Sequence, residues 1–201
     1  MNYLAHIYLS GDDPGVQIGN FIADGVKGNH YLDYPLSWQK GILLHRAIDA
    51  FTDGHPVFKK HARQLFPVHR HYSRVIVDLF YDHFLAANWP QFSTQSLALF
   101  SQRFYQLLTI HQSQLPERFG PLVAAMQKHN WLTQYSSLTG LRTILHQMSQ
   151  RAKFPCAMDE AVDDLEAVYT HYEKDFFSFF SDLEKFSQEK LHILNQKFHS
   201  P

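Results

Sequence analysis

The sequence predicts an all-α fold, a single-domain helical bundle that spans residues 1–201. Three observations favour this fold. Apolar side chains recur with a helical period along most of the chain. No run of alternating β-branched residues is long enough to form a strand. The length of 201 residues suits one domain with a sizeable core, and no linker or low-complexity segment divides it.

The first half of the chain is expected to contain a short N-terminal segment and four helices. The segment covers about residues 2–9 and is followed by the turn GDDPG. Gly28-Asn29, Gly54 with Pro56, and Trp89-Pro90 are signals that stop helices. Between these signals the helices are expected at about residues 15–27, 36–53, 56–65 and 70–88.

The second half is also predicted to be helical, with breaks at Asn130-Trp131 and Ser136-Ser137. Its helices are expected at about residues 94–111, 117–128 and 138–150, and a final acidic helix after Pro155 to about 197. Helical cores routinely use aromatic side chains. We therefore expect core packing, rather than an acyl-chain pocket, for Phe176, Phe177, Phe179 and Phe180.

The composition excludes several classes of protein. The single Cys156 rules out an internal disulfide and a cysteine-based zinc cluster, and it fits a reducing compartment. The start of the chain lacks the pattern of a secretory signal, and no run of about 18 apolar residues occurs. These features predict a cytoplasmic protein. The net charge of −1 names no partner, and neither a membrane nor a nucleic acid is expected as one.

Charges are distributed unevenly along the chain. Residues 54–77 contain five Lys or Arg residues and four histidines but no acid, whereas residues 159–189 contain ten acids and two lysines. Residues 54–77 therefore form a basic region that begins at the end of the stretch 41–56, and this region would attract an anionic substrate or an acidic protein surface.

The stretch GILLHRAIDAFTDGHP, residues 41–56, has an unusual pattern for a surface helix. His45, Asp49 and Asp53 follow one another at intervals of four residues, and such residues lie on one face of a helix. Most of the positions between them, such as Ile42 and Ile48, are apolar. A mostly apolar helix with one polar stripe is expected to be buried and to face a functional site.

Three other segments place His or Asp in apolar surroundings, and they contain His6, Asp24, and the group Asp78, Asp82 and His83. Burial of several carboxylates requires a compensating cation, and Arg46 is the only Lys or Arg in residues 41–56 and 77–85. A divalent metal supplies that charge. Imidazole and carboxylate ligands without thiolate favour Mn²⁺, Mg²⁺ or Fe over a structural zinc site.

A metal held in this way polarises phosphoryl oxygens and activates water. The sequence has no serine or cysteine nucleophile motif, no phosphate-binding loop and no dinucleotide fingerprint, so phosphate ester hydrolysis is the leading class of reaction. Structural roles stay open for four residues. His6 is also compatible with a hydrogen-bonded core histidine, Asp24 and Asp53 with turns or caps, and Asp78 with a salt bridge.

The motifs MNYLAHIYLS, GNFIADGVKG, GILLHRAIDAFTDGHP and VDLFYDHFLAANW resemble, in this order, those of the bacterial acyl carrier protein phosphodiesterases. The resemblance covers almost the whole chain. It implies a divergent, HD-domain-like phosphohydrolase that needs a divalent cation, typically manganese. The implied reaction hydrolyses the phosphodiester between 4′-phosphopantetheine and a serine of holo-acyl carrier protein, which releases apo-acyl carrier protein and 4′-phosphopantetheine.

Roles for individual residues are hypotheses, because HD enzymes carry an adjacent His-Asp pair that this sequence lacks. Here His45 and Asp49 lie one turn apart, and the pair Asp82-His83 is inverted. The expected metal ligands are Asp24, His45, Asp49 and Asp82. The expected catalytic residues are His6, His83, Arg46 and Asp53. His6 and His83 would serve as metal ligands or proton shuttles, and Arg46 would bind the phosphodiester oxygens. Asp53 would orient a ligand or activate water.

The acidic carrier protein is expected to dock on a basic surface made of Lys59, Lys60, Arg63, Arg70 and Arg74. Two alternatives stay open. The same metal site would also suit an HD-type phosphohydrolase that acts on a nucleotide or another small phosphoester. A non-catalytic helical binding protein, in which the carboxylates pair with Arg46, would need no metal.

Overall fold

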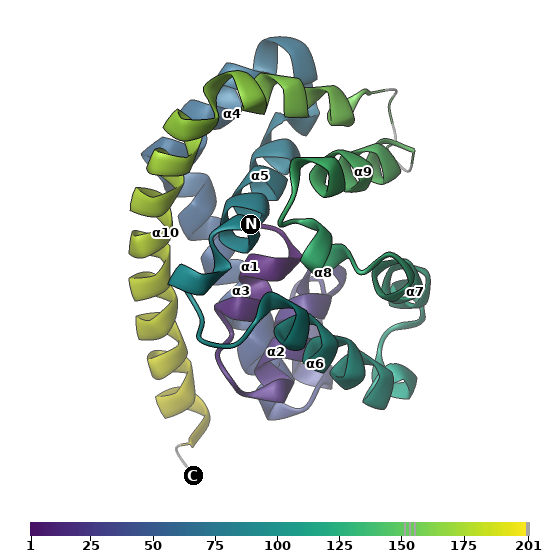
Figure 1. Cartoon of the computed structure of the whole chain (residues 1–201). Coiled ribbons are helices and arrows are strands. Elements are labelled where there is room, and N and C mark those ends of the chain that lie inside the picture. Colours follow the sequence, from purple (N-terminus) through teal and green to yellow (C-terminus); the bar gives the residue numbers. More distant parts are fainter. Residues whose placement is uncertain (151, 153, 155, 200–201) are drawn as a thin grey trace.

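The computed structural model describes residues 1–150, 152, 154 and 156–199, and every regular element in these residues is helical (Figure 1). The prediction of an all-α fold is therefore confirmed. Short 3₁₀ turns connect several of the α-helices. The α-helices are α1 (Tyr3–Tyr8), α2 (Pro14–Ile22), α3 (Leu36–Gly54), α4 (Pro56–His69), α5 (Ser73–Ala87), α6 (Leu97–Ile110), α7 (Gly120–His129), α8 (Trp131–Gln134), α9 (Leu138–Ser149) and α10 (Ala161–His199).

Helix α5 lies in the middle of the bundle and is apolar around most of its circumference. Ile76, Leu79, Phe80 and Leu85 have no exposed surface, which is typical of a helix surrounded by others. Helix α10 runs along one side of the molecule, at the left in Figure 1, and packs on α3, α4 and α5. The two helices together organise the core.

The aromatic side chains of α10 belong to this core, as predicted. Phe176, Phe179 and Phe180 are fully buried. The Phe179 ring centroid lies 4.9 Å from that of Tyr81 on α5, and the Phe176 centroid lies 5.6 Å from that of Phe84. These ring contacts stabilise the attachment of α10 to α5.

Helices α2 and α3 approach so closely that their backbones touch. A Cβ atom added to Gly19 would lie 2.1 Å from the carbonyl oxygen of Trp38, and one added to Gly41 would lie 2.2 Å from that of Val16. No larger residue fits at either position without a shift of the backbone. The close crossing allows short polar side chains of α2 to reach α3.

Some helix boundaries differ from those expected. The helix expected at 15–27 ends at Ile22, because a 3₁₀ turn, Ala23–Gly25, follows and Val26 is extended. This turn carries Asp24. Helix α4 continues past residue 65 to His69, and α5 begins at Ser73 rather than at residue 70, because Arg70 has a φ of 47° that no α-helix accommodates.

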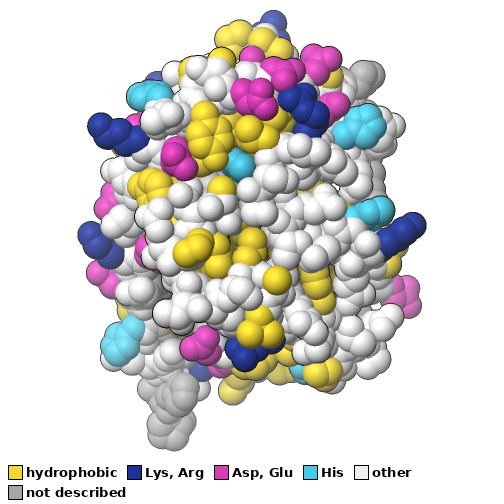
Figure 2. Space-filling view, viewed as in Figure 1, with side chains coloured by type: hydrophobic (Ala, Val, Ile, Leu, Met, Phe, Trp, Pro, Cys, Tyr) yellow, Lys and Arg dark blue, Asp and Glu magenta, His cyan; other side chains and the backbone are white. Residues whose placement is uncertain are grey.

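The surface carries charge in patches. Figure 2 shows acidic side chains gathered at the upper end of the molecule, over the first part of α10. This agrees with the acidic character predicted for the last helix. Among the helices of the described residues, none combines the length and the apolar character that crossing a bilayer requires.

Candidate metal centre

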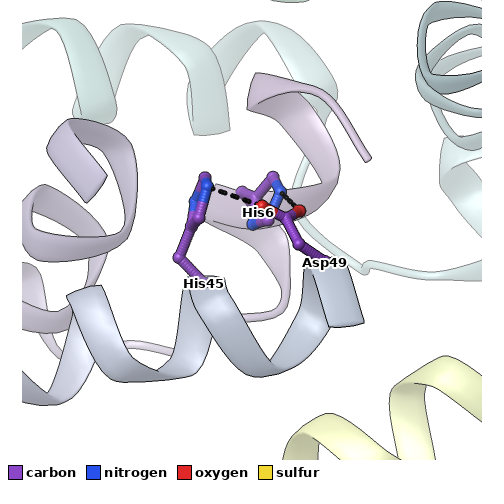
Figure 3. Close-up of side chains that lie close together, drawn as sticks. All are labelled: His6, His45 and Asp49. Carbon is purple, nitrogen blue, oxygen red and sulfur yellow. Dashed lines mark ion pairs between the residues drawn. The ribbon is translucent and has the colours of Figure 1, made fainter. Parts of the chain in front are cut away.

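Three side chains from two helices converge in the structure: His6 of α1, and His45 and Asp49 of α3 (Figure 3). His6 Nε2 lies 3.2 Å from Asp49 Oδ1, and His45 Nε2 lies 3.1 Å from Asp49 Oδ2. The two imidazole rings stack with their centroids 4.0 Å apart. One potential ligand atom from each residue lies within 4.8 Å of the others. The one-turn spacing of His45 and Asp49 thus places both on the face of α3 that meets α1.

Asp24 extends this cluster toward solvent. Its Oδ1 lies 3.2 Å from His45 Nε2, and its side chain is 70% exposed. The 3₁₀ turn Ala23–Gly25, which interrupts the helix at this point, brings the carboxylate to α3. His45 Nε2 therefore faces two carboxylates, one on the inner side of the cluster and one at the surface.

The residues present fit a divalent cation. Ligands about 2.1 Å from a metal lie roughly 3.0 Å apart along an octahedral edge, close to the spacings of His45, Asp49 and Asp24. His6 is buried, and among the described residues no partner meets hydrogen-bond geometry at either ring nitrogen, although Nε2 lies 3.2 Å from Asp49 Oδ1. Burial and the neighbouring His45 lower the pKa of His6 to about 4, so its imidazole is neutral, which is the form that binds metals.

Proton and metal would compete for His45. Burial lowers the pKa of this imidazole, but hydrogen bonds and charge from Asp24 and Asp49 outweigh that effect and raise it to about 9. Without a metal, the imidazolium is thus the counter-charge between the carboxylates. His45 would have to lose its Nε2 proton to hold a cation there, because only the deprotonated nitrogen has a free lone pair.

Asn20 also belongs to the site, although the sequence patterns did not point to it. It is fully buried on α2, and its Oδ1 lies 2.9 Å from His45 Nδ1. A signal was present in the sequence, since Asn20 and Asp24 are four residues apart, as are His45 and Asp49. A neutral side chain such as that of Asn20 is nevertheless common in helices, so the pattern gave no reason to predict it as a site residue.

Asp82 lies outside this cluster. Its carboxylate accepts hydrogen bonds from the backbone N–H groups of Leu4 (2.8 Å) and Ala5 (3.2 Å), the first turn of α1. Burial raises its pKa to about 7, although these hydrogen bonds act in the opposite direction. Asp78, one turn earlier, forms an ion pair at 2.8 Å with the amino group of Met1. Both carboxylates of α5 therefore hold the beginning of the chain.

His83 and Asp53 also point elsewhere. His83 lies 2.7 Å through Nδ1 from the carbonyl oxygen of Tyr135 and 2.9 Å through Nε2 from the hydroxyl of Tyr169, so both ring nitrogens are occupied. Asp53, on the exposed end of α3, forms an ion pair with Arg74 at 2.7 Å. The structure does not bring either residue into the His6–His45–Asp49 cluster.

Arg46 follows His45 on α3 and borders the site. It donates a hydrogen bond of 2.8 Å to the carbonyl oxygen of Val26, and its guanidinium lies 5.5 Å from the centroid of the Tyr31 ring. Within the described residues it has no carboxylate at ion-pair distance. Its charge is therefore available to an anion.

The predicted docking residues fall into two groups. Three of them are engaged: Lys59 with the carbonyl oxygen of Gly54, Lys60 with Asp175, and Arg74 with Asp53. The other two, Arg63 and Arg70, are exposed on either side of Phe66, which is itself 47% exposed. Arg70 lies 5.8 Å from the centroid of the Phe66 ring. The basic surface therefore includes an apolar side chain.

Comparisons with known proteins show which family the chain belongs to. The family model described as acyl carrier protein phosphodiesterase matches residues 1–183. Three proteins named acyl carrier protein phosphodiesterase are similar to this chain. The relative in Photorhabdus laumondii is 31% identical to it, and the match covers 94% of this chain and 96% of the relative. The relatives in Pectobacterium atrosepticum and Yersinia pestis are 34% and 32% identical, with 90% and 94% of this chain and 94% and 99% of the relative covered. No solved structure matches the chain significantly. The chain thus belongs to the acyl carrier protein phosphodiesterase family.

Proposed function

We propose that the protein hydrolyses the phosphodiester between 4′-phosphopantetheine and the serine of holo-acyl carrier protein, with Mn²⁺ as its cation, in the cytoplasm. Membership of the family supports the substrate. The observation that carries the mechanism is the convergence of His6, His45 and Asp49 on one point beside the exposed Asp24. Imidazole and carboxylate ligands suit Mn²⁺, and a reducing compartment fits the single cysteine.

In this proposal His6, His45, Asp49 and Asp24 hold the cation. A divalent cation at this place supplies polarisation of a phosphoryl oxygen and activation of a water molecule at neutral pH. Arg46 binds a non-bridging oxygen of the substrate, since guanidinium groups form strong hydrogen bonds with phosphates. Asp53, Asp82 and His83 are not included, because their polar atoms are engaged elsewhere.

Removal of the metal tests the proposal. We expect the purified protein with Mn²⁺ to convert holo-acyl carrier protein to the apo form, and EDTA to reduce this reaction to background. Mass spectrometry of the carrier protein measures the conversion, and Mn²⁺ added in excess of EDTA should restore it. Release of phosphate from nucleotides, with no change in the mass of the carrier protein, would contradict the proposal.

The docking surface is proposed to include Arg63 and Arg70 with the exposed Phe66 between them. The double variant Arg63→Glu/Arg70→Glu is expected to raise KM for holo-acyl carrier protein about tenfold at low salt, with kcat nearly unchanged, because rim charges act mainly on association. The matched control is Lys128→Glu/Lys185→Glu, which reverses the charge of two exposed lysines outside this surface. An equal rise in KM in both variants would exclude a specific surface.

A further inference from the structure

We propose that Asn20 is a positioning residue of the metal centre, which keeps the proton of His45 on Nδ1 and turns Nε2 toward Asp49 and Asp24. The inference rests on the metal site in the proposed function but not on the choice of substrate. Its basis is the set of three hydrogen bonds made by one buried amide group.

Within the described residues, the partners of the Asn20 side chain lie on α1, on α3 or in the turn that follows α1. Its Nδ2 donates to the carbonyl oxygen of His6 at 3.0 Å and to Ser10 Oγ at 2.9 Å. Its Oδ1 lies 2.9 Å from His45 Nδ1. Ser10 Oγ in turn donates to the carbonyl oxygen of His6 at 2.8 Å. Asn20 and Ser10 are fully buried, so water does not replace these partners.

The donors and acceptors in this network allow one arrangement. A backbone carbonyl only accepts, so the NH₂ group of Asn20 must face His6. Ser10 gives its only proton to the same carbonyl, so its oxygen accepts from Asn20. The remaining atom, Oδ1, is an acceptor, and His45 must therefore carry a proton on Nδ1. Once Nδ1 keeps this proton, Nε2 is the nitrogen left to bind a metal.

The same amide couples the two histidines of the cluster. Asn20 holds the backbone of His6 on one side and the ring of His45 on the other, and the two rings stack at 4.0 Å. Asn20 spans this distance because Gly19 and Gly41 let α2 and α3 meet backbone to backbone. Groups that orient a metal-binding histidine in this way typically contribute 10- to 100-fold to metal affinity.

Three variants of the full-length protein test the inference. Asn20→Ala removes all three hydrogen bonds, and we expect it to weaken Mn²⁺ binding about 10- to 100-fold. Asn20→Asp keeps an acceptor for Nδ1–H but loses both donors. We expect it to retain Mn²⁺ affinity within about threefold, and to unfold at lower temperature in EDTA because the buried carbonyl of His6 loses a partner. Asn29→Ala, the same truncation at an exposed position, should change neither property.

Two measurements separate positioning from a merely structural role. Free Mn²⁺ measured by electron paramagnetic resonance gives the Kd, and ¹H–¹⁵N NMR of the Zn²⁺-loaded wild type should show the proton of His45 on Nδ1. Three results would each overturn the inference. They are a Mn²⁺ affinity of Asn20→Ala equal to that of the wild type, a metal bound to Nδ1 of His45, and a wild type that binds neither Mn²⁺ nor Zn²⁺. If Asn20→Ala does not fold, the NMR result and Asn20→Asp still decide it. A wild type that binds metal through Nε2 but leaves holo-acyl carrier protein intact would contradict only the proposed function.

Discussion

Replacement of Asp49 by asparagine is expected to weaken Mn²⁺ binding at least about a hundredfold, roughly 2.8 kcal/mol, and to reduce hydrolysis of holo-acyl carrier protein to background. Asp49 is the residue that touches both histidines, through Oδ1 to His6 and Oδ2 to His45. Those contacts outweigh the effect of burial and hold its pKa well below the usual range, so the side chain is an anion at neutral pH. Asparagine has nearly the same shape but no charge. Isothermal titration with Mn²⁺ measures the loss.

The matched control for this variant lies one turn further along the same helix. Asp53→Asn makes the identical change on α3, but Asp53 is paired with Arg74 and lies outside the cluster. We expect its Mn²⁺ affinity to stay within about threefold of wild type. In addition, Mn²⁺ should raise the temperature of unfolding of the wild type and of Asp53→Asn, but not of Asp49→Asn, because only the first two bind it tightly. Equal affinities in the two variants would remove Asp49 from the ligand set.

Replacement of Asp82 by alanine is expected to lower the free energy of unfolding by about 2–4 kcal/mol. The variant leaves the buried N–H groups of Leu4 and Ala5 without an acceptor, and each unsatisfied buried donor costs about 1–3 kcal/mol. Chemical denaturation followed by circular dichroism measures this change. The exposed carboxylate of Asp33, truncated in the same way, should cost less than about 1 kcal/mol.

Asp82→Asn distinguishes a cap from a ligand. The amide keeps one oxygen acceptor for the first turn of α1, so we expect intermediate stability. Because Asp82 is engaged with backbone rather than with the histidine cluster, Mn²⁺ affinity should change by less than about threefold. If Asp82→Asn loses Mn²⁺ as completely as Asp49→Asn does, the carboxylate is a ligand after all, as its spacing in the sequence led us to expect.

The periodicity of the sequence was sufficient for the helices and for part of the site. A spacing of four residues on one helix is a local property, so the sequence alone identifies His45 and Asp49 as neighbours on one face. The stop signals also located most helix ends. The start of α5 was misplaced because the positive φ of Arg70 depends on how the chain turns between α4 and α5.

The role of Asp82 could not be derived in the same way. Asp78 and Asp82 show the same four-residue spacing on an apolar helix, and nothing local distinguishes them from His45 and Asp49. What differs is the neighbour that folding supplies. The N–H groups in the first turn of α1 have no acceptor within that helix, and they meet Asp82 on α5. His6, further along α1, meets Asp49 on α3 instead. A spacing predicts that side chains share a face, but only the packing of helices decides what lies opposite.

The close crossing of α2 and α3 gives chemical importance to positions that carry no functional group. The backbone contacts at Gly19 and Gly41 set the distance between α2 and α3, and this distance decides whether Asn20 reaches the His45 ring. A single added methyl group would force the pair apart. The geometry of the proposed metal centre therefore depends on two positions at which only glycine, with no side chain, lets the helices come so close.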